Sequence, residues 1–403
     1  MASPLVINPA FLSGALAISG PGPSLLAVDG GGAVQVFMVN TAVFGAMVDI
    51  SGLTIQNGFS AGQGGAVFNS NTSGTTTFTD VAMRNNSAGG FGGAIFNSSG
   101  TLVLKGVTVE GNSAIFGGGI INVGTMSLTN VTLSDNAARG GGAIYNIAAM
   151  TLINATLSGN SASMAGFGGG ILNGGTLRLK NTIVANSLSG SDCAPVAGAL
   201  LSDGYNLDSD GSCALGAASD LPNTNPLLGP LADNGGPTMT HALMDGSPAI
   251  DAGSPDCPPP ATDQRGVARP QDGNGDGASA CDIGAYEVTV QSVTVPIDIK
   301  PGSFPNSVNP RSRGVVPVAI LTTPDFDATM VDSVTVGFGP SRAAPVHVAI
   351  EYADGDDLPD MVLHFRTEQT GIQCGDTSAA LAGKTFDGTA FEGSDSINTA
   401  GCK

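Results

Sequence analysis

The chain has 403 residues, of which 60 are glycine and 41% are hydrophobic, and its formal net charge is −19. Because intrinsic disorder requires low hydrophobicity with high charge, this composition indicates a folded chain, and the length allows about two or three domains. An acidic chain is a poor partner for nucleic acid, whose binding depends on Lys and Arg. No apolar run approaches the about 20 residues needed to span a bilayer, so we expect no membrane span either.

A glycine-rich hexamer that ends in asparagine recurs five times in the first half of the chain. The spacings between the final asparagines are 28, 25, 24 and 27 residues, and these asparagines are Asn69, Asn97, Asn122, Asn146 and Asn173. This period is typical of a coiled repeat, and the glycine pairs and the apolar spacing of two disfavour helix. We therefore predict that residues 1–186 form a right-handed parallel β-helix.

A second motif, a β-branched strand followed by a bend, runs with the same period. It ends at Asn86, Asn112, Asn136, Asn160 and, in an imperfect copy, Asn186. Side chains that recur once per turn stack at the strand spacing of about 4.8 Å, so both sets of asparagines are expected to form amide ladders.

These two motifs together resemble the repeats of polymorphic outer-membrane-protein-type β-helices in bacterial surface proteins, over residues 19–186. The segments that follow, such as GYNLDSDGSC (204–213), DQRGVARP (263–270) and CDIGAYE (281–287), occur in the order seen in the choice-of-anchor Q domain. The resemblance implies a location on or outside a bacterial cell rather than a particular chemistry.

All six cysteines lie after the repeats, in the part of the chain that carries the net negative charge. Fifteen connectivities are possible, and free thiols or a metal site are alternatives, although no CxxC spacing occurs. Sequential pairing is the simplest because each pair closes a loop of about 20 to 30 residues. The predicted disulfides join Cys193 to Cys213, Cys257 to Cys281 and Cys374 to Cys402, and they imply an extracellular or cell-surface location.

Two domains are expected after the β-helix. Residues 187–290 are rich in Pro, Asp and Gly, and we predict a loop-rich, disulfide-stapled cap that covers the open strand edge of the last turn. Residues 291–403 contain short alternating runs separated by turns, which predict a β-sandwich. This last part resembles an uncharacterised C-terminal module of secreted bacterial proteins.

Two acidic loops are candidate Ca²⁺ sites, because hard oxygen ligands at alternating positions suit this ion. Asp272, Asn274 and Asp276 match the first half of a calcium loop; its usual terminal Glu is missing, but Asp282 lies near that position. The second loop holds Asp354, Asp356, Asp357 and Asp360. A solvated acidic turn is the alternative for each.

The expected function is structural or adhesive and not enzymatic, with a surface glycan or protein as partner. Many parallel β-helices cleave polysaccharides, so a lyase or hydrolase acting in a groove is the alternative; Glu110 and Asp135 are the acids closest in repeat phase. Self-association head to tail into a fibre is a further hypothesis. An adhesin of this class is expected to show an exposed apolar or aromatic patch on one column of the repeats.

Overall fold

The computed structural model describes residues 3–7, 15–40, 45–276, 278–289 and 292–402. It is all-β, as predicted, and divides into two compact units. The first comprises Met1–Asn274 with Ser279–Val288, and the second comprises Gly275–Ala278 with Thr289–Lys403.

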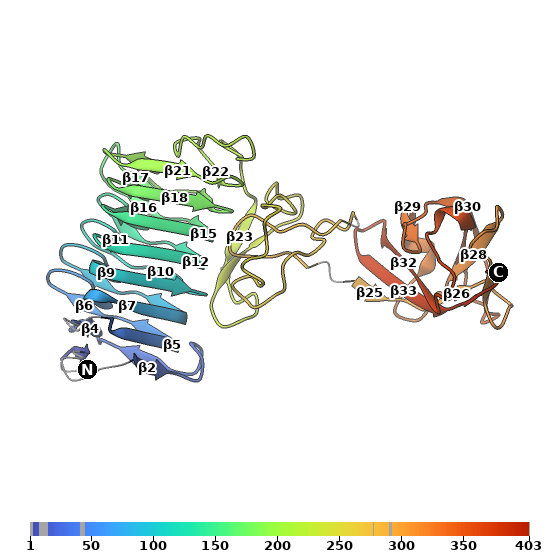
Figure 1. The fold of residues 1–403 in the computed structure, drawn as a ribbon, viewed down its shortest axis with the longest axis horizontal. Helices are drawn as coiled ribbons and strands as arrows, with labels where there is room; N and C mark the ends of the chain where they lie inside the picture. The colour runs from blue at the N-terminus through green and yellow to red at the C-terminus, as the bar shows by residue number, and fades with distance from the viewer. Residues whose placement is uncertain (1–2, 8–14, 41–44, 277, 290–291, 403) are drawn as a thin grey trace. The chain divides into compact units, whose positions relative to one another are not determined.

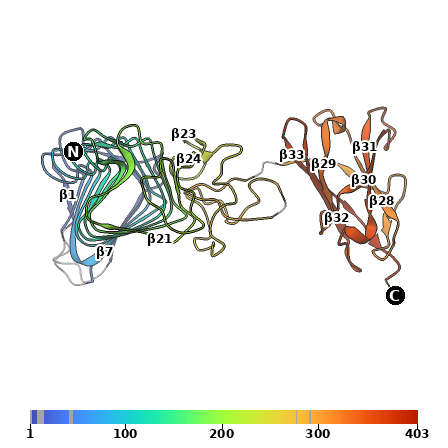
Figure 2. The same cartoon turned by 90° about the horizontal axis from the view of Figure 1, so that it is seen from above.

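The first unit contains a parallel β-solenoid, whose turns stack one above another (Figures 1 and 2). Strands of successive turns pair in parallel; for example, Ile120 of one turn lies opposite Ile144 of the next. Its strands are β1 (Leu5–Ile7), β2 (Ala15–Ser19), β3 (Ala27–Asp29), β4 (Phe37–Val39), β5 (Met47–Gln56), β6 (Phe59–Ser60), β7 (Val67–Arg84), β8 (Ser87–Ala88), β9 (Ile95–Lys105), β10 (Thr108–Glu110), β11 (Ile120–Asn122), β12 (Thr125–Ser134), β13 (Ala137–Ala138), β14 (Ile144–Asn146), β15 (Ala149–Ser158), β16 (Ser161–Ala162), β17 (Gly168–Asn173), β18 (Thr176–Lys180), β19 (Ile183–Ala185), β20 (Ser191–Pro195), β21 (Ala199–Ser202) and β22 (Leu207–Asp208).

Apolar side chains stack in columns inside the solenoid. One column is fully buried and continues through six turns in register: Ile50, Phe78, Leu104, Leu128, Leu152 and Leu179. Because side chains alternate between the two faces of a strand, the period-two pattern of the sequence places every second residue in this core.

One corner of the solenoid is built from residues in the left-handed backbone region. They have φ values of 49° to 64°, which glycine, asparagine and aspartate adopt at the least cost. The column consists of Gly52, Asp80, Gly106, Asn130, Asn154 and Asn181. The corner explains why small or short polar residues recur between the two strands of each turn.

The last turn extends beyond the predicted boundary at residue 186, because β20, β21 and β22 still pair with the turn before. Residues 209–221 then close the end: Cys213 is buried, Leu215 packs against the solenoid core and Leu221 forms a bridge with Leu207. This short loop covers the open strand edge of the last turn, the role that we predicted for residues 187–290 as a whole.

The rest of the predicted cap runs along the side of the solenoid. We call residues 225–274 and 279–288 the lateral segment; it contains β23 (Leu228–Ala232) and β24 (Thr240–Leu243). Gln264 joins two turns, since its amide donates to Thr108 Oγ1 at 2.9 Å and its carbonyl accepts from Thr132 Oγ1 at 2.8 Å. The backbone N–H of Ala285 donates to Thr156 of the next turn. A cap over the end was thus expected, whereas most of this region covers a threonine column on one side.

His241 of β24 also ties the lateral segment to the solenoid. Its Nε2 lies 3.0 Å from Ser134 Oγ and its Nδ1 lies 2.8 Å from the carbonyl oxygen of Gly229. Burial lowers the pKa of His241, while its bond to Gly229 and the charge of Asp135 oppose this shift. The neutral imidazole is therefore the form that the fold favours.

The second unit is the predicted β-sandwich. Its two four-stranded sheets follow the orders β25-β33-β32-β29 and β26-β28-β31-β30 and enclose one apolar core. Its elements are β25 (Ser292–Thr294), β26 (Ile297–Ile299), β27 (Ser307–Val308), β28 (Val315–Ile320), the 3-10 turn η1 (Ala328–Met330), β29 (Val331–Phe338), β30 (Pro345–Glu351), β31 (Asp360–Arg366), the 3-10 turn η2 (Thr367–Gln369), β32 (Ser378–Thr385), β33 (Ala390–Ser396) and β34 (Asn398–Thr399).

Candidate functional site

The first set of predicted asparagines forms a continuous buried ladder. Each side-chain N–H donates to the carbonyl of the next, at 2.8 Å from Asn69 to Asn97, 2.8 Å to Asn122, 3.0 Å to Asn146 and 2.9 Å to Asn173. All five are at most 2% exposed. Because these side-chain amides hydrogen-bond to one another, the ladder stabilises the solenoid and offers no groups for binding a ligand.

The second ladder holds four of its five predicted members. Asn86, Asn112, Asn136 and Asn160 are linked at 3.0, 2.9 and 3.0 Å. Asn186 does not belong: its register places it opposite Gly159, where it is exposed with φ at 56°, and Ser187 takes the place opposite Asn160. The prediction for Asn186 was wrong because this asparagine occupies the left-handed bend position that Asp135 and Gly159 hold in the earlier turns, one residue before the ladder position.

The structure contains the three predicted disulfides. They join Cys193 to Cys213, Cys257 to Cys281 and Cys374 to Cys402. The first holds the loop that closes the last turn, the second lies in the lateral segment, and the third lies in the β-sandwich.

One predicted ligand of the first Ca²⁺ site, Asp282, is engaged in other contacts. Asp282 is 1% exposed, and its two carboxylate oxygens accept from the backbone N–H groups of Asp251 and Val288. Asn274 is exposed, and its N–H donates to Asp251. The predicted ligand Asp282 belongs instead to a buried polar cluster.

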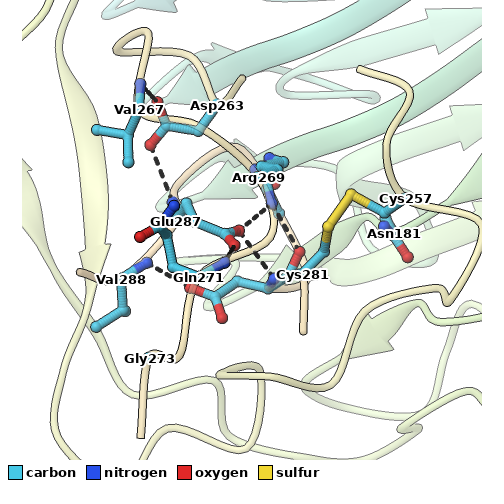
Figure 3. Close-up of polar contacts among 12 residues, drawn as sticks. Asn181, Cys257, Asp263, Val267, Arg269, Gln271, Gly273, Cys281, Glu287 and Val288 are labelled. Carbon is cyan, nitrogen blue, oxygen red and sulfur yellow. Dashed lines mark hydrogen bonds and ion pairs between the residues drawn. A yellow bond between two sulfur atoms is a disulfide. The ribbon is translucent and has the colours of Figure 1, made fainter. Parts of the chain in front are cut away.

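The centre of this cluster is a buried ion pair between Arg269 and Glu287 at 2.6 Å (Figure 3). Arg269 also donates to the carbonyl oxygens of Asp282 and Gly284, and Glu287 accepts from the N–H groups of Gln271 and Asp282. Burial, and then the charge of Glu287, raise the pKa of Asp282 to about 7. The cluster lies next to the disulfide Cys257–Cys281 and fixes the loops of the lateral segment to each other.

The second predicted Ca²⁺ site is divided between core and solvent. Asp360 is fully buried, and its carboxylate accepts from the N–H groups of Thr322 and Ala353. Asp354, Asp356 and Asp357 are exposed, and the first two accept from the N–H groups two residues further on. These bonds are those of solvated turns, which was the alternative reading.

An aromatic stripe, which the sequence analysis did not identify, runs over successive turns of the solenoid. Neighbouring ring centres lie 5.5 to 6.5 Å apart, and the stripe consists of Phe68, Phe91, Phe96, Phe116, Tyr145 and Phe167. Phe91 is 37% exposed, whereas Phe96 is buried beneath it. The sequence does contain a signal for the stripe, because Phe91, Phe116 and Phe167 each come directly before the glycine run of their turn.

A hollow of 390 Å³ lies at one end of this stripe. Its lining combines two aromatic rings with neutral polar groups: Gln35, Met38, Ser60, Gly62, Gln63, Phe68, Gly90 and Phe91. None of these side chains carries a charge, so the hollow suits a neutral ligand with both apolar faces and hydrogen-bonding groups.

A second site, which we call the Arg84–Glu110 groove, lies between the solenoid and the lateral segment. It has a volume of 220 Å³ and is lined by Pro23, Ser24, Thr54, Ala82, Arg84, Thr108, Glu110, Asp233, Gly236, Pro237, Thr238 and Met239. Arg84 and Glu110 occupy equivalent positions on neighbouring turns. A bond from Arg84 Nε to Gln56 Oε1, at 2.8 Å, orients the guanidinium.

Glu110 is half-buried in this groove. Burial raises its pKa, the Arg84 guanidinium opposes the shift, and the charge of Asp135 adds to it. A carboxyl group with a raised pKa beside a cation is a candidate for general acid–base chemistry. The predicted pair of Glu110 and Asp135 is therefore linked electrostatically, but the groove is lined by Glu110 and Asp233 instead.

Comparisons with known proteins do not add a family: no protein-family model, curated protein or solved structure matches the chain. In the part of the chain that the structure describes, no helix has the length and apolarity needed to span a bilayer.

Proposed function

We propose that this chain is an extracellular, non-catalytic adhesive protein that binds a neutral polysaccharide along the aromatic stripe. The observation that carries the proposal is the run of partly exposed aromatic rings on consecutive turns, centred on Phe91 and Phe116. Exposed apolar patches on folded proteins mark sites of interaction more often than chance.

The chemistry of the stripe favours a sugar polymer over a compact ligand. Rings on neighbouring turns lie 5.5 Å apart for Phe68 and Phe96 and 6.2 Å apart for Phe91 and Phe116, so an extended chain with flat apolar faces contacts several turns. The neutral groups Ser60 and Gln63 at the end of the stripe match hydroxyl groups. The buried amide ladders keep the turns rigid, and this lowers the entropy lost on binding.

The three disulfides support the proposed location. Structural disulfides persist in oxidising compartments, and here each one closes a loop of 20 to 28 residues. An extracellular protein that presents a rigid binding face fits this requirement.

The experiment is a binding screen of the full chain against neutral and acidic polysaccharides, followed by isothermal titration with the best ligand. Phe91→Ala and Phe116→Ala are expected to lower affinity about tenfold each. Phe59→Ala is the matched control, because Phe59 is 39% exposed and belongs to β6, outside the stripe. Unchanged affinity in both stripe variants, or an equal loss in the control, would reject the proposal.

The Arg84–Glu110 groove favours a second candidate function, cleavage of a polysaccharide. The specific observation is that Glu110 and Arg84 line the groove at equivalent positions of neighbouring turns, where burial raises the pKa of Glu110. Incubation of the same panel with the wild type should then release new reducing ends or unsaturated products, and Glu110→Gln should abolish the release. Glu351→Gln, an exposed change of the same kind on β30, is the control. The adhesive function predicts that no product forms with any of the three proteins.

A further inference from the structure

The closing loop of the solenoid contains an acidic cluster that neither Ca²⁺ prediction included. Asp192 of β20, Asp208 of β22 and Asp210 each contribute a carboxylate oxygen to a group in which these oxygens lie within 4.8 Å of one another. Asp192 and Asp208 are at most 1% exposed, while Asp210 reaches the surface. Two oxygens bound to one Ca²⁺ at about 2.4 Å are at most about 4.8 Å apart, so the spacing fits this ion.

Most carboxylate oxygens of the cluster accept hydrogen bonds, and these bonds orient them. Asp192 accepts from the N–H and hydroxyl groups of Ser187 and Ser209. Asp210 accepts from the N–H groups of Asp192 and Ser212. Because these donors favour the ionised carboxylates, the cluster brings several negative charges together.

One buried oxygen has no partner within the described part of the chain. Asp208 Oδ1 accepts from the N–H groups of Asp210 and Gly211, but Asp208 Oδ2 makes no hydrogen bond although it is shielded from solvent. An unsatisfied buried oxygen is costly and rare, and it is commonly explained by an ion or a water molecule. The unpartnered Asp208 Oδ2 therefore points to a ligand bound at the acidic cluster, independently of the spacing of the three carboxylates.

The charge of this cluster is not compensated by any salt bridge of the described residues. Among the described residues, the salt bridges involve other acids, and none contains Asp192, Asp208 or Asp210. A divalent cation supplies both the missing charge and the missing partner of Asp208 Oδ2.

We propose that Asp192, Asp208 and Asp210 hold one Ca²⁺ ion, which ties the closing loop to the last turn of the solenoid. The disulfide Cys193–Cys213 joins the two segments that carry these ligands. In the sequence, Asp208 and Asp210 have the spacing of the first two ligands of a calcium loop, whereas Cys213 stands where that loop has its glycine. The inference does not depend on the proposed adhesive function.

The test is isothermal titration of the full chain, stripped of metal by a chelator, with CaCl₂ and separately with MgCl₂. One Ca²⁺ per chain is expected, together with weaker Mg²⁺ binding and a rise of about 5 °C in the unfolding midpoint of the first unit at saturating calcium. Asp208→Asn keeps the oxygen that accepts the two backbone N–H groups but is expected to abolish binding.

Two further variants keep the inference open to refutation. Asp210→Asn changes an exposed ligand and is expected to weaken Ca²⁺ binding at least tenfold without unfolding the chain. The double change of Asp354→Asn and Asp356→Asn, in the other acidic loop, should leave binding intact. Lack of binding by the wild type at about 10 mM Ca²⁺, above the usual extracellular range, would overturn the inference. The inference would also be overturned if Asp210→Asn bound Ca²⁺ as tightly as the wild type, or if only the double variant lost Ca²⁺ binding.

Discussion

Asn122→Ala is the perturbation that most sharply tests the amide ladder. Asn122 is fully buried, accepts from Asn97 Nδ2 at 2.8 Å, and donates to Asn146 Oδ1 at 3.0 Å and to the Ala149 carbonyl oxygen at 2.9 Å. Alanine removes all three bonds. Asn97 Nδ2 keeps one acceptor, the carbonyl oxygen of Thr125, whereas Asn146 Oδ1 loses its donor in the ladder.

The expected cost follows from these contacts. A buried polar group left without a partner costs about 1–3 kcal/mol, and here one ladder oxygen loses its donor while two further groups lose one bond each. We therefore expect Asn122→Ala to lower the free energy of unfolding of the first unit by about 4 kcal/mol.

The assay is urea unfolding of the full chain, with hydrogen exchange measured by mass spectrometry on peptides from residues 95–150. Asn186→Gly is the control, because Asn186 is exposed, lies outside the ladder and has a positive φ that glycine tolerates. The control should change stability by no more than about 0.5 kcal/mol. If Asn122→Ala matched the control in both measurements, the ladder would not contribute as described.

Four other outcomes are expected. Replacing Cys193 and Cys213 by serine should cost about 3 kcal/mol, as for a loop of 20 residues, and speed exchange mainly in the last turn; equal exchange would contradict this. Because the folded-state pKa of His241 lies below its usual value of 6.5, the stability from its neutral form is fully present above about pH 6.5 and is lost as the pH falls through the folded-state pKa. Exchange in the lateral segment should therefore rise in mild acid, and His241→Gln should reduce that rise. Arg269→Met should cost about 3–5 kcal/mol by leaving Glu287 unpaired, and adding Glu287→Gln should recover part of it in denaturant unfolding. If the chain self-associates head to tail, sedimentation velocity should show species that grow with concentration; a single monomer peak at every concentration would reject the fibre hypothesis.

The repeat pattern predicted the solenoid because its information is local and cumulative. Each turn repeats the same strand, bend and asparagine, and parallel pairing in register then places Asn97, Asn122 and Asn146 in one column. The order of the cysteines also indicated the pairs, since each closes a short loop within one region.

The failures of the sequence analysis concern tertiary contacts and single-residue shifts. Asn186 keeps the motif but lies one position out of register, which no composition pattern reveals. Asp282 has the spacing of a metal ligand, yet its oxygens are held by backbone N–H groups in the buried cluster around Arg269. Gln264 has no local signal at all, although it connects the lateral segment to two turns of the solenoid.

The aromatic stripe and the acidic cluster were missed for a related reason. Phe91 and Phe116 are 25 residues apart in the sequence and become neighbours only when the turns stack. Asp192 and Asp208 are 16 residues apart, on two different strands of the last turn, β20 and β22. The aromatic stripe can be identified from the sequence by a search for aromatic residues that recur at the repeat period, whereas a search for contiguous motifs misses it.

The most direct test of the adhesive function is a crystal structure of the chain with an oligosaccharide from the best polysaccharide of the binding screen. The proposal predicts sugar rings against Phe91 and Phe116, with hydroxyl groups near Gln63 at the end of the stripe. An oligosaccharide bound only in the Arg84–Glu110 groove, or only on the β-sandwich, would contradict it.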